Sequence, residues 1–260
     1  MPFAPVNNID LFYESHGTGP AIVFLHGRGG NHLSWWQQVP HFQKRFRCIA
    51  IDHREFGLSR EQPGGPGRKA FAEDLRQLLD HLGIERACLV GQSMGGFTAM
   101  DFAVRHPKRV AGMVLADTTG GIAAPDVLEA MRANVAKLPE QPTARSLALD
   151  FPEREPALAF LYSGLGRLTL SIRESLEDLL LNQDGPTLDD LAAWSAHKIP
   201  VQVIVGARDV MIPPEIARRV AAHLPGAKLA VIEDAGHSAY FEKPQAFNAV
   251  LDAFLATLRY

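Results

Sequence analysis

The chain has 260 residues, of which 47% are apolar and 21% are charged. These values are ordinary for a globular protein, and the length suits a single α/β domain. The net charge of -3 excludes the broad basic field that nucleic acids and anionic membranes select. The first residues lack the basic start and apolar run of a signal peptide, and no apolar run is long enough to span a bilayer. We therefore expect a cytoplasmic protein that binds neither nucleic acid nor membrane.

The two cysteines, Cys48 and Cys88, lie in apolar runs that resemble strands. Two cysteines are too few for a disulfide framework, so both are expected to be buried free thiols. No group of cysteines and histidines has the spacing of a zinc site. The sequence therefore predicts a protein that needs no metal and no cofactor.

The first predicted elements are the two strands of a hairpin, at residues 3–6 and 9–15, around the turn pair Asn7 and Asn8. Short apolar runs rich in β-branched residues follow along the chain. They occupy residues 21–27, 47–53, 87–93, 112–118, 201–209 and 228–237. Because these runs are continuously apolar, both faces of each strand are expected to be buried, as in a parallel sheet covered by helices.

Helical patterns alternate with these strands. Residues 69–83 carry an apolar face and end at Gly83, and residues 97–107 carry a second apolar face and end at Pro107. Alternating strands and helices are typical of an α/β fold. We therefore predict a mostly parallel, doubly wound sheet of about eight strands with helices on both faces.

The alternation stops between residues 119 and 199, where amphipathic helical patterns occur without a clear strand. We interpret this segment as a helical lid inserted after the sixth strand. Residues 1–118 and 200–260 then form the core of the domain. The lid is expected over the carboxyl ends of the strands, where open α/β sheets bind ligands.

Ser93 lies in the motif Gly91-Gln92-Ser93-Met94-Gly95, between a predicted strand and a predicted helix. A G-x-S-x-G motif in this context predicts a sharp turn that exposes a nucleophilic serine. Glycines are expected on both sides, because side chains there would clash with the strained turn. The helix that follows would favour negative charge developing near Ser93.

A serine nucleophile needs a base, and the base needs an acid that orients it. In this type of fold both follow the serine, the acid first. Asp209 and His237 each follow a predicted strand, at the same edge of the sheet as Ser93. Asp117 is an alternative acid at that edge, whereas Asp234 is expected to shape the turn before His237.

The oxyanion of an acyl-transfer intermediate needs two N–H donors. We expect one from Met94, directly after the nucleophile, and the other from Arg28, in the loop after the strand at 21–27. His26, in the same loop, is expected to be a structural residue.

The motifs HGRGG, DHREFGLS, GQSMGG, GARDVMIPP and AGHSAYFEKP occur in this order along the chain. With them the chain resembles the α/β-hydrolase fold superfamily over nearly its whole length. It looks most similar to small bacterial members with a lid: esterases, enol-lactone hydrolases, C–C bond hydrolases and cofactor-free haloperoxidases. The resemblance implies Ser93 as nucleophile, His237 as base and Asp209 as its orienting acid. Epoxide hydrolases and haloalkane dehalogenases of this fold use an aspartate nucleophile, so Ser93 argues against both.

Two residues depart from the pattern of these relatives. Glu55 stands where the DHREFGLS loop usually has a glycine, which raises a question about the backbone of that loop. Arg28 stands where many relatives have a small or apolar residue. Two roles are open for its side chain: contact with a substrate carboxylate near the oxyanion site, or exposure to solvent.

The lid, which is apolar over residues 158–170, is expected to supply walls for an apolar substrate group. The predicted substrate contacts are Arg28, Trp35, Leu161, Tyr162, Val210 and Ser238. Most apolar residues of the lid are equally suited to packing it onto the sheet. The same apolar surface fits a monomer or a homodimer.

The first hypothesis for function is hydrolysis of a small carboxylic ester or lactone through an acyl-enzyme on Ser93. An amidase or peptidase is a variant of the same chemistry. The alternative enzyme is a C–C bond hydrolase of a vinylogous diketone, which requires a carboxylate clamp from Arg28, Arg167 or Arg173. The alternative outside enzymes is a ligand receptor on the same fold.

Overall fold

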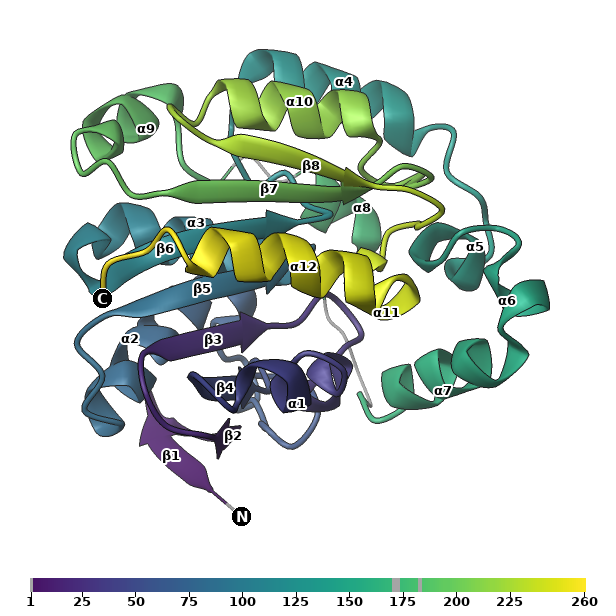
Figure 1. The fold of residues 1–260 in the computed structure, drawn as a ribbon. Coiled ribbons are helices and arrows are strands. Elements are labelled where there is room, and N and C mark those ends of the chain that lie inside the picture. Colours follow the sequence, from purple (N-terminus) through teal and green to yellow (C-terminus); the bar gives the residue numbers. More distant parts are fainter. Residues whose placement is uncertain (1, 170–173, 182–183) are drawn as a thin grey trace.

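The computed structural model describes residues 2–169, 174–181 and 184–260, in which eight strands form one sheet (Figure 1). Their order across the sheet is β1-β2-β4-β3-β5-β6-β7-β8. The strands are β1 (Phe3–Val6), β2 (Ile9–His16), β3 (Ala21–Leu25), β4 (Arg47–Ile51), β5 (Ala87–Gln92), β6 (Val110–Ala116), β7 (Val201–Gly206) and β8 (Lys228–Ile232). The predicted α/β fold with a mostly parallel sheet is confirmed.

The amino-terminal hairpin accounts for the antiparallel part of the sheet. β1 pairs with β2, and β2 pairs with β4, both in antiparallel register. The other neighbouring strands, in the order β4-β3-β5-β6-β7-β8, pair in parallel register. The hairpin turns at Asn7 and Asn8, with φ of 44° and 64°. Asparagine tolerates this left-handed conformation better than most residues, so the Asn pair suits the two-residue turn.

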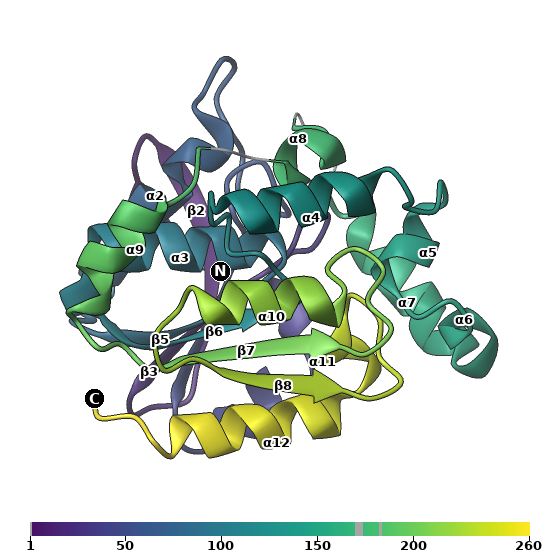
Figure 2. The same ribbon diagram turned by 90° about the horizontal axis from the view of Figure 1, so that it is seen from above.

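Helices cover both faces of the sheet, as the view from above shows (Figure 2). On one face lie α2 (Phe71–His81), α3 (Met94–Arg105) and α10 (Pro214–Ala222). On the other lie α1 (Val39–Phe42) and α12 (Pro244–Leu255). The remaining helices of the core are η1 (His32–Trp35), η2 (Gly67–Ala70), η3 (Pro107–Arg109) and α11 (Ala239–Glu242).

Between β6 and β7 the described residues form helices and no strand. The helices are α4 (Pro125–Val135), α5 (Pro142–Ser146), α6 (Phe151–Arg154), α7 (Pro156–Gly166), α8 (Leu176–Leu180) and α9 (Leu188–Ser195). α5, α6 and α7 lie beyond the carboxyl ends of the strands (Figure 1). α4 instead contacts α10, and α9 contacts α3. Only part of the segment therefore occupies the edge where we expected all of it.

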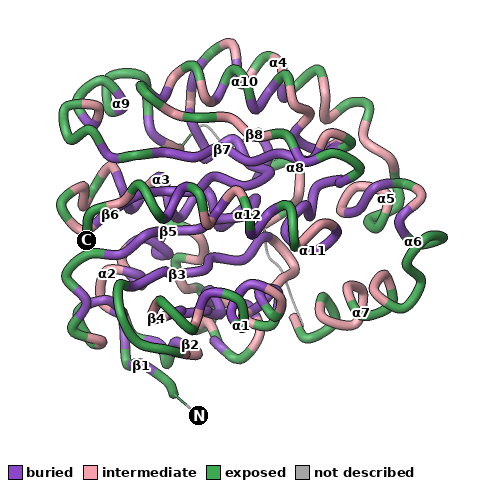
Figure 3. The backbone as a smooth tube through the Cα atoms, in the orientation of Figure 1, coloured by how far each residue is buried: buried purple, intermediate pink, exposed green. Residues whose placement is uncertain are grey.

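Burial follows the sheet, with exposed positions concentrated on the outer surfaces of the helices (Figure 3). Every residue of β3, β5, β6 and β7 is buried, as their continuous apolarity predicted. For β8 the prediction is wrong: this strand is at the edge of the sheet, and only Ile232 is buried. Cys48 and Cys88 are buried free thiols. Within the described ranges, no helix has both the length and the apolar character to cross a membrane.

Candidate active site

Ser93 occupies a strained turn between β5 and α3. Its φ of 50° and ψ of −117° lie outside the regions that residues with a side chain favour. A Cβ atom at Gly91 would lie 2.4 Å from the carbonyl oxygen of Gly95, and one at Gly95 would lie 2.1 Å from that of Leu25. Neither contact is sterically possible, so the turn requires glycine at both positions.

His237 and Asp209 meet at the same edge of the sheet, in the loops after β8 and β7. Nδ1 of His237 lies 2.9 Å from Oδ2 of Asp209, and the two residues are 4% and 3% exposed. The backbone N–H groups of Met211 and Ile212 donate to Oδ1 of Asp209 at 2.8 and 2.9 Å. These bonds fix the carboxylate, and the carboxylate in turn orients the imidazole ring.

The other ring nitrogen of His237 has no partner in the part of the chain that the structure describes, and the residue shares a cavity with Ser93. Nε2 of His237 is buried and has no hydrogen-bond partner within the described residues. His237 and Ser93 both line a cavity of about 290 Å³. The side-chain amide of Gln92 donates to the carbonyl of His237 at 2.8 Å, so the residue before Ser93 also holds the histidine loop. The arrangement leaves a nitrogen base available beside a serine hydroxyl.

Asp117, the alternative acid, has other partners. Its carboxylate accepts hydrogen bonds from the N–H of Gly206 at 2.9 Å and of Ala239 at 3.3 Å. Burial, and then the charge of Asp209, raise the pKa of Asp117 well above its usual value. Of the two candidates, the structure pairs Asp209 with His237. Asp234 is exposed, with a left-handed φ of 55°, as expected for a residue that shapes a turn.

Glu242 holds the histidine loop from the other side. Its carboxylate accepts the N–H of Gly236 and the N–H of Ala148, each at 2.9 Å. A Cβ atom at Gly236 would lie 2.3 Å from the nitrogen of Ala148. The segment after β6 therefore contacts the backbone directly before His237. Burial raises the pKa of Glu242.

The two residues predicted to supply oxyanion donors are Met94, directly after Ser93, and Arg28, in a loop that approaches it. Met94 is the first residue of α3, so its N–H has no acceptor within the helix. Arg28 lies in the loop after β3 and lines the same cavity as Ser93. A Cβ atom at Gly27 would lie 3.1 Å from the Cβ of Ser93, which shows how closely this loop approaches the serine.

His26 has structural contacts. Nδ1 of His26 lies 2.8 Å from the carbonyl oxygen of Gly27, and Nε2 accepts the N–H of His53 at 3.0 Å. The ring is buried, and burial lowers the pKa of His26 to about 4. A neutral histidine thus joins the loop after β3 to the loop after β4.

Glu55 adopts a left-handed backbone conformation, which glycine adopts more readily than other residues. Its φ is 76°, in the left-handed region, which costs a side-chain-bearing residue about 1 kcal/mol. Gly57 follows with a φ of 52°, and a Cβ atom there would lie 2.1 Å from Oδ2 of Asp52. Asp52 also accepts the N–H of Leu58 at 2.7 Å. The loop therefore keeps its left-handed turn despite the substitution.

A larger cavity of about 590 Å³ adjoins the one at Ser93. Both are lined by Arg28, Gln92, Pro142, Ser146 and Tyr162. The hydroxyl of Tyr162, on α7, lies 2.8 Å from Oγ of Ser238. Of the predicted substrate contacts, Arg28 and Tyr162 therefore line both cavities, whereas Ser238 is buried behind Tyr162 and lines neither.

Three predicted contact residues lie elsewhere. Trp35 is 0% exposed and packs in the core, with ring centroids 5.1 Å from Phe24 and 4.7 Å from Tyr240. Leu161 is on the exposed side of α7, and the carbonyl of Val210 accepts a hydrogen bond from Asn134. None of the three is among the residues that line the two cavities.

Sequence reasoning missed Arg145 and Ser146 on α5, and Leu176 and Met211, which line the cavity with Ser93. Nothing in the local sequence of α5 indicates that this short helix lies at the site. Arg167 lines the larger cavity, whereas Arg173 lies outside the described residues.

Comparison with known proteins assigns the class: the chain matches the alpha/beta hydrolase fold over residues 20–244 and belongs to that family. Among individual relatives, it is 33% identical to BpoC of Mycobacterium tuberculosis, described as a candidate non-heme bromoperoxidase, over 96% of this chain and 99% of that protein. It is 30% identical to 3-oxoadipate enol-lactonase 2 of Acinetobacter baylyi, over 95% and 94%.

A solved structure shows the same fold. A thermophilic esterase from Thermogutta terrifontis superposes with a TM-score of 0.78 and 28% identity, over 95% of this chain and 93% of the esterase. The fold is therefore shared along almost the whole chain.

Proposed function

We propose that the protein hydrolyses a small carboxylic ester or lactone through an acyl-enzyme on Ser93. The observation that carries the proposal is the His237–Asp209 pair at 2.9 Å, in which Nε2 of His237 is unpartnered within the described residues, together with the cavity that His237 and Ser93 both line. A base oriented by a buried carboxylate and placed beside a serine is the arrangement that activates the hydroxyl.

In the first half of the reaction, Nε2 of His237 takes the proton of Ser93 while Oγ bonds to the ester carbon. The tetrahedral intermediate then loses the alcohol, which takes the proton from His237. In the second half, His237 takes a proton from water, the hydroxide adds to the acyl carbon, and Ser93 leaves with that proton. For a lactone the leaving alcohol stays attached to the acyl group. Asp209 stabilises the imidazolium in both halves.

The oxyanion of each tetrahedral intermediate is assigned to the N–H groups of Met94 and Arg28. Met94 adds the positive end of the α3 dipole, since it is the first residue of that helix. Donors held by the fold before reaction stabilise the developing charge without reorganisation. Loss of one such donor typically costs about 10²- to 10³-fold in rate.

We also assign the lid to residues 119–199 and the catalytic core to residues 1–118 and 200–260. Tyr162 on α7 and Arg145 on α5 line the cavities beside Ser93, which supports this division. The remaining walls include Leu165, Leu176 and Met211, and these favour a largely apolar substrate. The names of the enol-lactonase and esterase relatives favour an ester or lactone bond.

The test is hydrolysis of p-nitrophenyl esters of increasing acyl length by the wild type, Ser93→Ala and Ser195→Ala. Ser195 is on α9, away from the cavity, and controls for the loss of a hydroxyl. We expect kcat to fall by about 10⁴-fold or more in Ser93→Ala and to stay at the wild-type value in Ser195→Ala. Activity that survives in Ser93→Ala, or a wild type that cleaves none of the esters, would contradict the proposal.

A further inference from the structure

The two cavities described above, at Ser93 and adjoining it, have basic but no acidic lining residues, whereas a third cavity that Arg28 lines with Met94 also includes Glu55 and Glu174. Three arginines line the first two cavities: Arg28 lines both, Arg145 lines the smaller and Arg167 the larger. Within the described ranges, none of the three arginines has an ion pair with a carboxylate. A recess with charges of one sign concentrates the electrostatic potential and attracts ions of the opposite sign.

Arg28 has unused hydrogen-bonding capacity. Its Nη2 donates to the backbone carbonyl of Glu174 at 3.0 Å. Its Nε is buried and has no acceptor in the described part of the chain. The carboxylate of Glu174 is engaged elsewhere, because Nε and Nη2 of Arg68 donate to it at 2.9 Å each. The guanidinium of Arg28 is therefore half-buried without an ion pair of its own in the described residues, although the charge of Glu174 lies near it.

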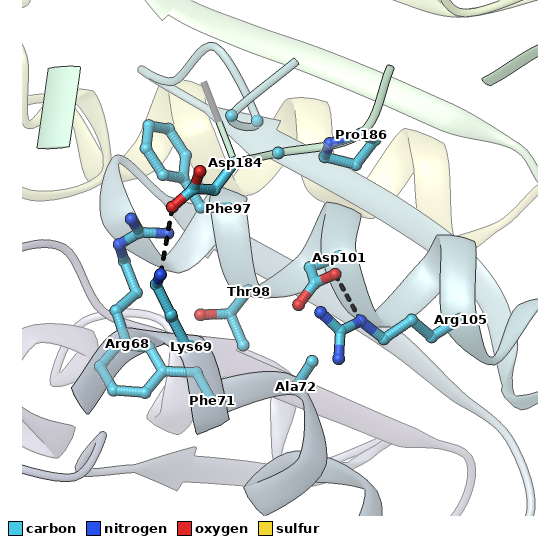
Figure 4. Close-up of a pocket in the computed structure, with 13 residues that line it drawn as sticks. Arg68, Lys69, Phe71, Ala72, Phe97, Thr98, Asp101, Arg105, Asp184 and Pro186 are labelled. Carbon is cyan, nitrogen blue, oxygen red and sulfur yellow. Dashed lines mark hydrogen bonds and ion pairs between the residues drawn. The ribbon is translucent and has the colours of Figure 1, made fainter. Parts of the chain in front are cut away.

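In another cavity of this protein, acidic and basic lining residues form ion pairs with each other. This cavity lies between α2 and α3, measures about 160 Å³, and is lined by both acidic and basic residues (Figure 4). There, Lys69 pairs with Asp184 at 3.4 Å, and Arg105 with Asp101 at 2.7 Å (Figure 4). The two cavities beside Ser93 differ from this one in having no acidic lining residue. The charge of Glu174 acts on Arg28 from outside them, and Arg68 holds that carboxylate in an ion pair.

We infer that the substrate carries a carboxylate group, which the guanidinium of Arg28 binds while its ester or lactone carbonyl lies at Ser93. The inference rests on the proposed hydrolysis and adds the substrate class: half-esters of short dicarboxylic acids, or lactones that bear a carboxylate. Arginine presents parallel N–H groups that match the two oxygens of a carboxylate. Because the backbone of Arg28 is adjacent to Ser93, the spacer between carboxylate and scissile carbonyl is short. Arg145 and Arg167 add to the electrostatic attraction of the carboxylate, but neither needs to contact it.

The test compares two substrates of equal chain length, phenyl hydrogen glutarate and phenyl pentanoate. The quantity measured is the ratio of kcat/KM for the charged ester to that for the neutral ester. We expect the wild type to favour the charged ester by about tenfold or more. Arg28→Met should lower the ratio by about 10- to 100-fold, the range for a lost hydrogen bond to a charged group. Arg28→Lys keeps the charge but lacks the planar guanidinium group. Its ratio should lie between those of the wild type and Arg28→Met.

Arg219→Met is the matched control, because Arg219 is on α10 and lines neither cavity. It should keep the wild-type ratio. A direct binding measurement removes the dependence on turnover: calorimetric titration of Ser93→Ala with phenyl hydrogen glutarate, with and without Arg28→Met, should show Kd rising by about 10- to 100-fold.

The outcomes separate the inference from the function on which it rests. If Ser93→Ala stops hydrolysis of both esters and Arg28→Met leaves both the ratio and Kd unchanged, the carboxylate inference is wrong and the proposed hydrolysis stands. A wild type that favours phenyl pentanoate also overturns the inference alone. If Ser93→Ala still hydrolyses the esters, the proposed function fails, and the inference fails with it.

Discussion

Ser93 and Asp117 follow the neighbouring strands β5 and β6, and both have φ close to +50°. Such conformations cost energy and persist only where surrounding contacts fix them, which is why they gather at functional sites. The N–H of Ser93 donates to the carbonyl of Ala116, and the N–H of Asp117 donates to that of Ile204. The two residues are thus held by the sheet itself, although only Ser93 lines the cavity with His237.

The roles of Asp209 and Asp117 differ in a way that two substitutions can separate. Asp209→Asn keeps the shape of the side chain but favours the wrong histidine tautomer, so we expect kcat to fall by about 10³- to 10⁴-fold. Asp117→Asn loses one of two backbone hydrogen bonds, and we expect kcat to fall by less than about tenfold. The measurement is kcat on a p-nitrophenyl ester, with circular dichroism confirming that both variants fold. Equal losses would contradict the assignment of the acid.

At the residue scale, motif spacing and chain order were sufficient to predict that Ser93, Asp209 and His237 lie at one edge of the sheet, because the carboxyl ends of parallel strands meet there. The structure pairs Asp209 with His237, and His237 lines a cavity with Ser93. Trp35 and Leu161 could not be placed in this way. Whether a side chain after a loop turns toward the cavity or the core depends on packing partners that are distant in sequence, such as Tyr240 for Trp35.

At the scale of elements, the turn between β5 and α3 depends on the close approach of three backbone segments. A Cβ atom at Gly95 would meet backbone atoms of Leu25 and His26 within 3 Å, and none of these is a flexible side-chain end. The strand β3, the turn and the helix α3 therefore fit together only with glycine at this position.

Gly95→Ala should lower the free energy of unfolding by about 3 kcal/mol or more, since the clash is with backbone. Gly164→Ala is the matched control: Gly164 is in α7, and a Cβ atom there would meet nothing within 4 Å. It should raise stability by up to about 1 kcal/mol through helix propensity. Urea denaturation measures both. A Gly95→Ala variant as stable as the wild type would show that the turn can shift.

The strands were predictable because continuous apolar runs of this length have few alternatives to a buried strand. Their ends were not, and the run at 201–209 leaves the sheet at Gly206. The helices after β6 were also predictable as helices, but their positions were not. The sequences of α4 and α5 do not show that α4 packs against α10 while α5 lines the cavity.

At the scale of the whole molecule, buried histidines link stability to pH. The folded pKa of His26 is about 4, below the value of about 6.5 for an unfolded chain. Between these values the unfolded chain binds a proton that the folded chain excludes, so stability falls as the pH falls through this window. Burial lowers the pKa of His53 as well, with the same sign. The raised pKa values of Asp117 and Glu242 act in the opposite direction.

His26→Gln removes one of these protonation sites and keeps a hydrogen-bonding side chain. Between pH 7 and pH 5, the wild type should lose about 2 kcal/mol more stability than the variant. The contributions of Asp117 and Glu242 are common to both proteins and cancel in the difference. Burial is the first cause of the low pKa of His53 and remains in the variant, whereas the smaller effect of the His26 charge on His53 is removed with His26. Urea unfolding at the two pH values provides the measurement. Parallel losses in the two proteins would show that His26 is protonated within the fold.

The two hydrogen bonds that Glu242 accepts, from Gly236 and from Ala148, have a consequence for divergence within such a family. They attach the segment after β6 to the backbone before His237 at one fixed point. Changes of sequence or length beyond Ala148 can then reshape the walls of the cavity without displacing His237. The part of the substrate range that these walls determine can therefore evolve without a change in the catalytic residues.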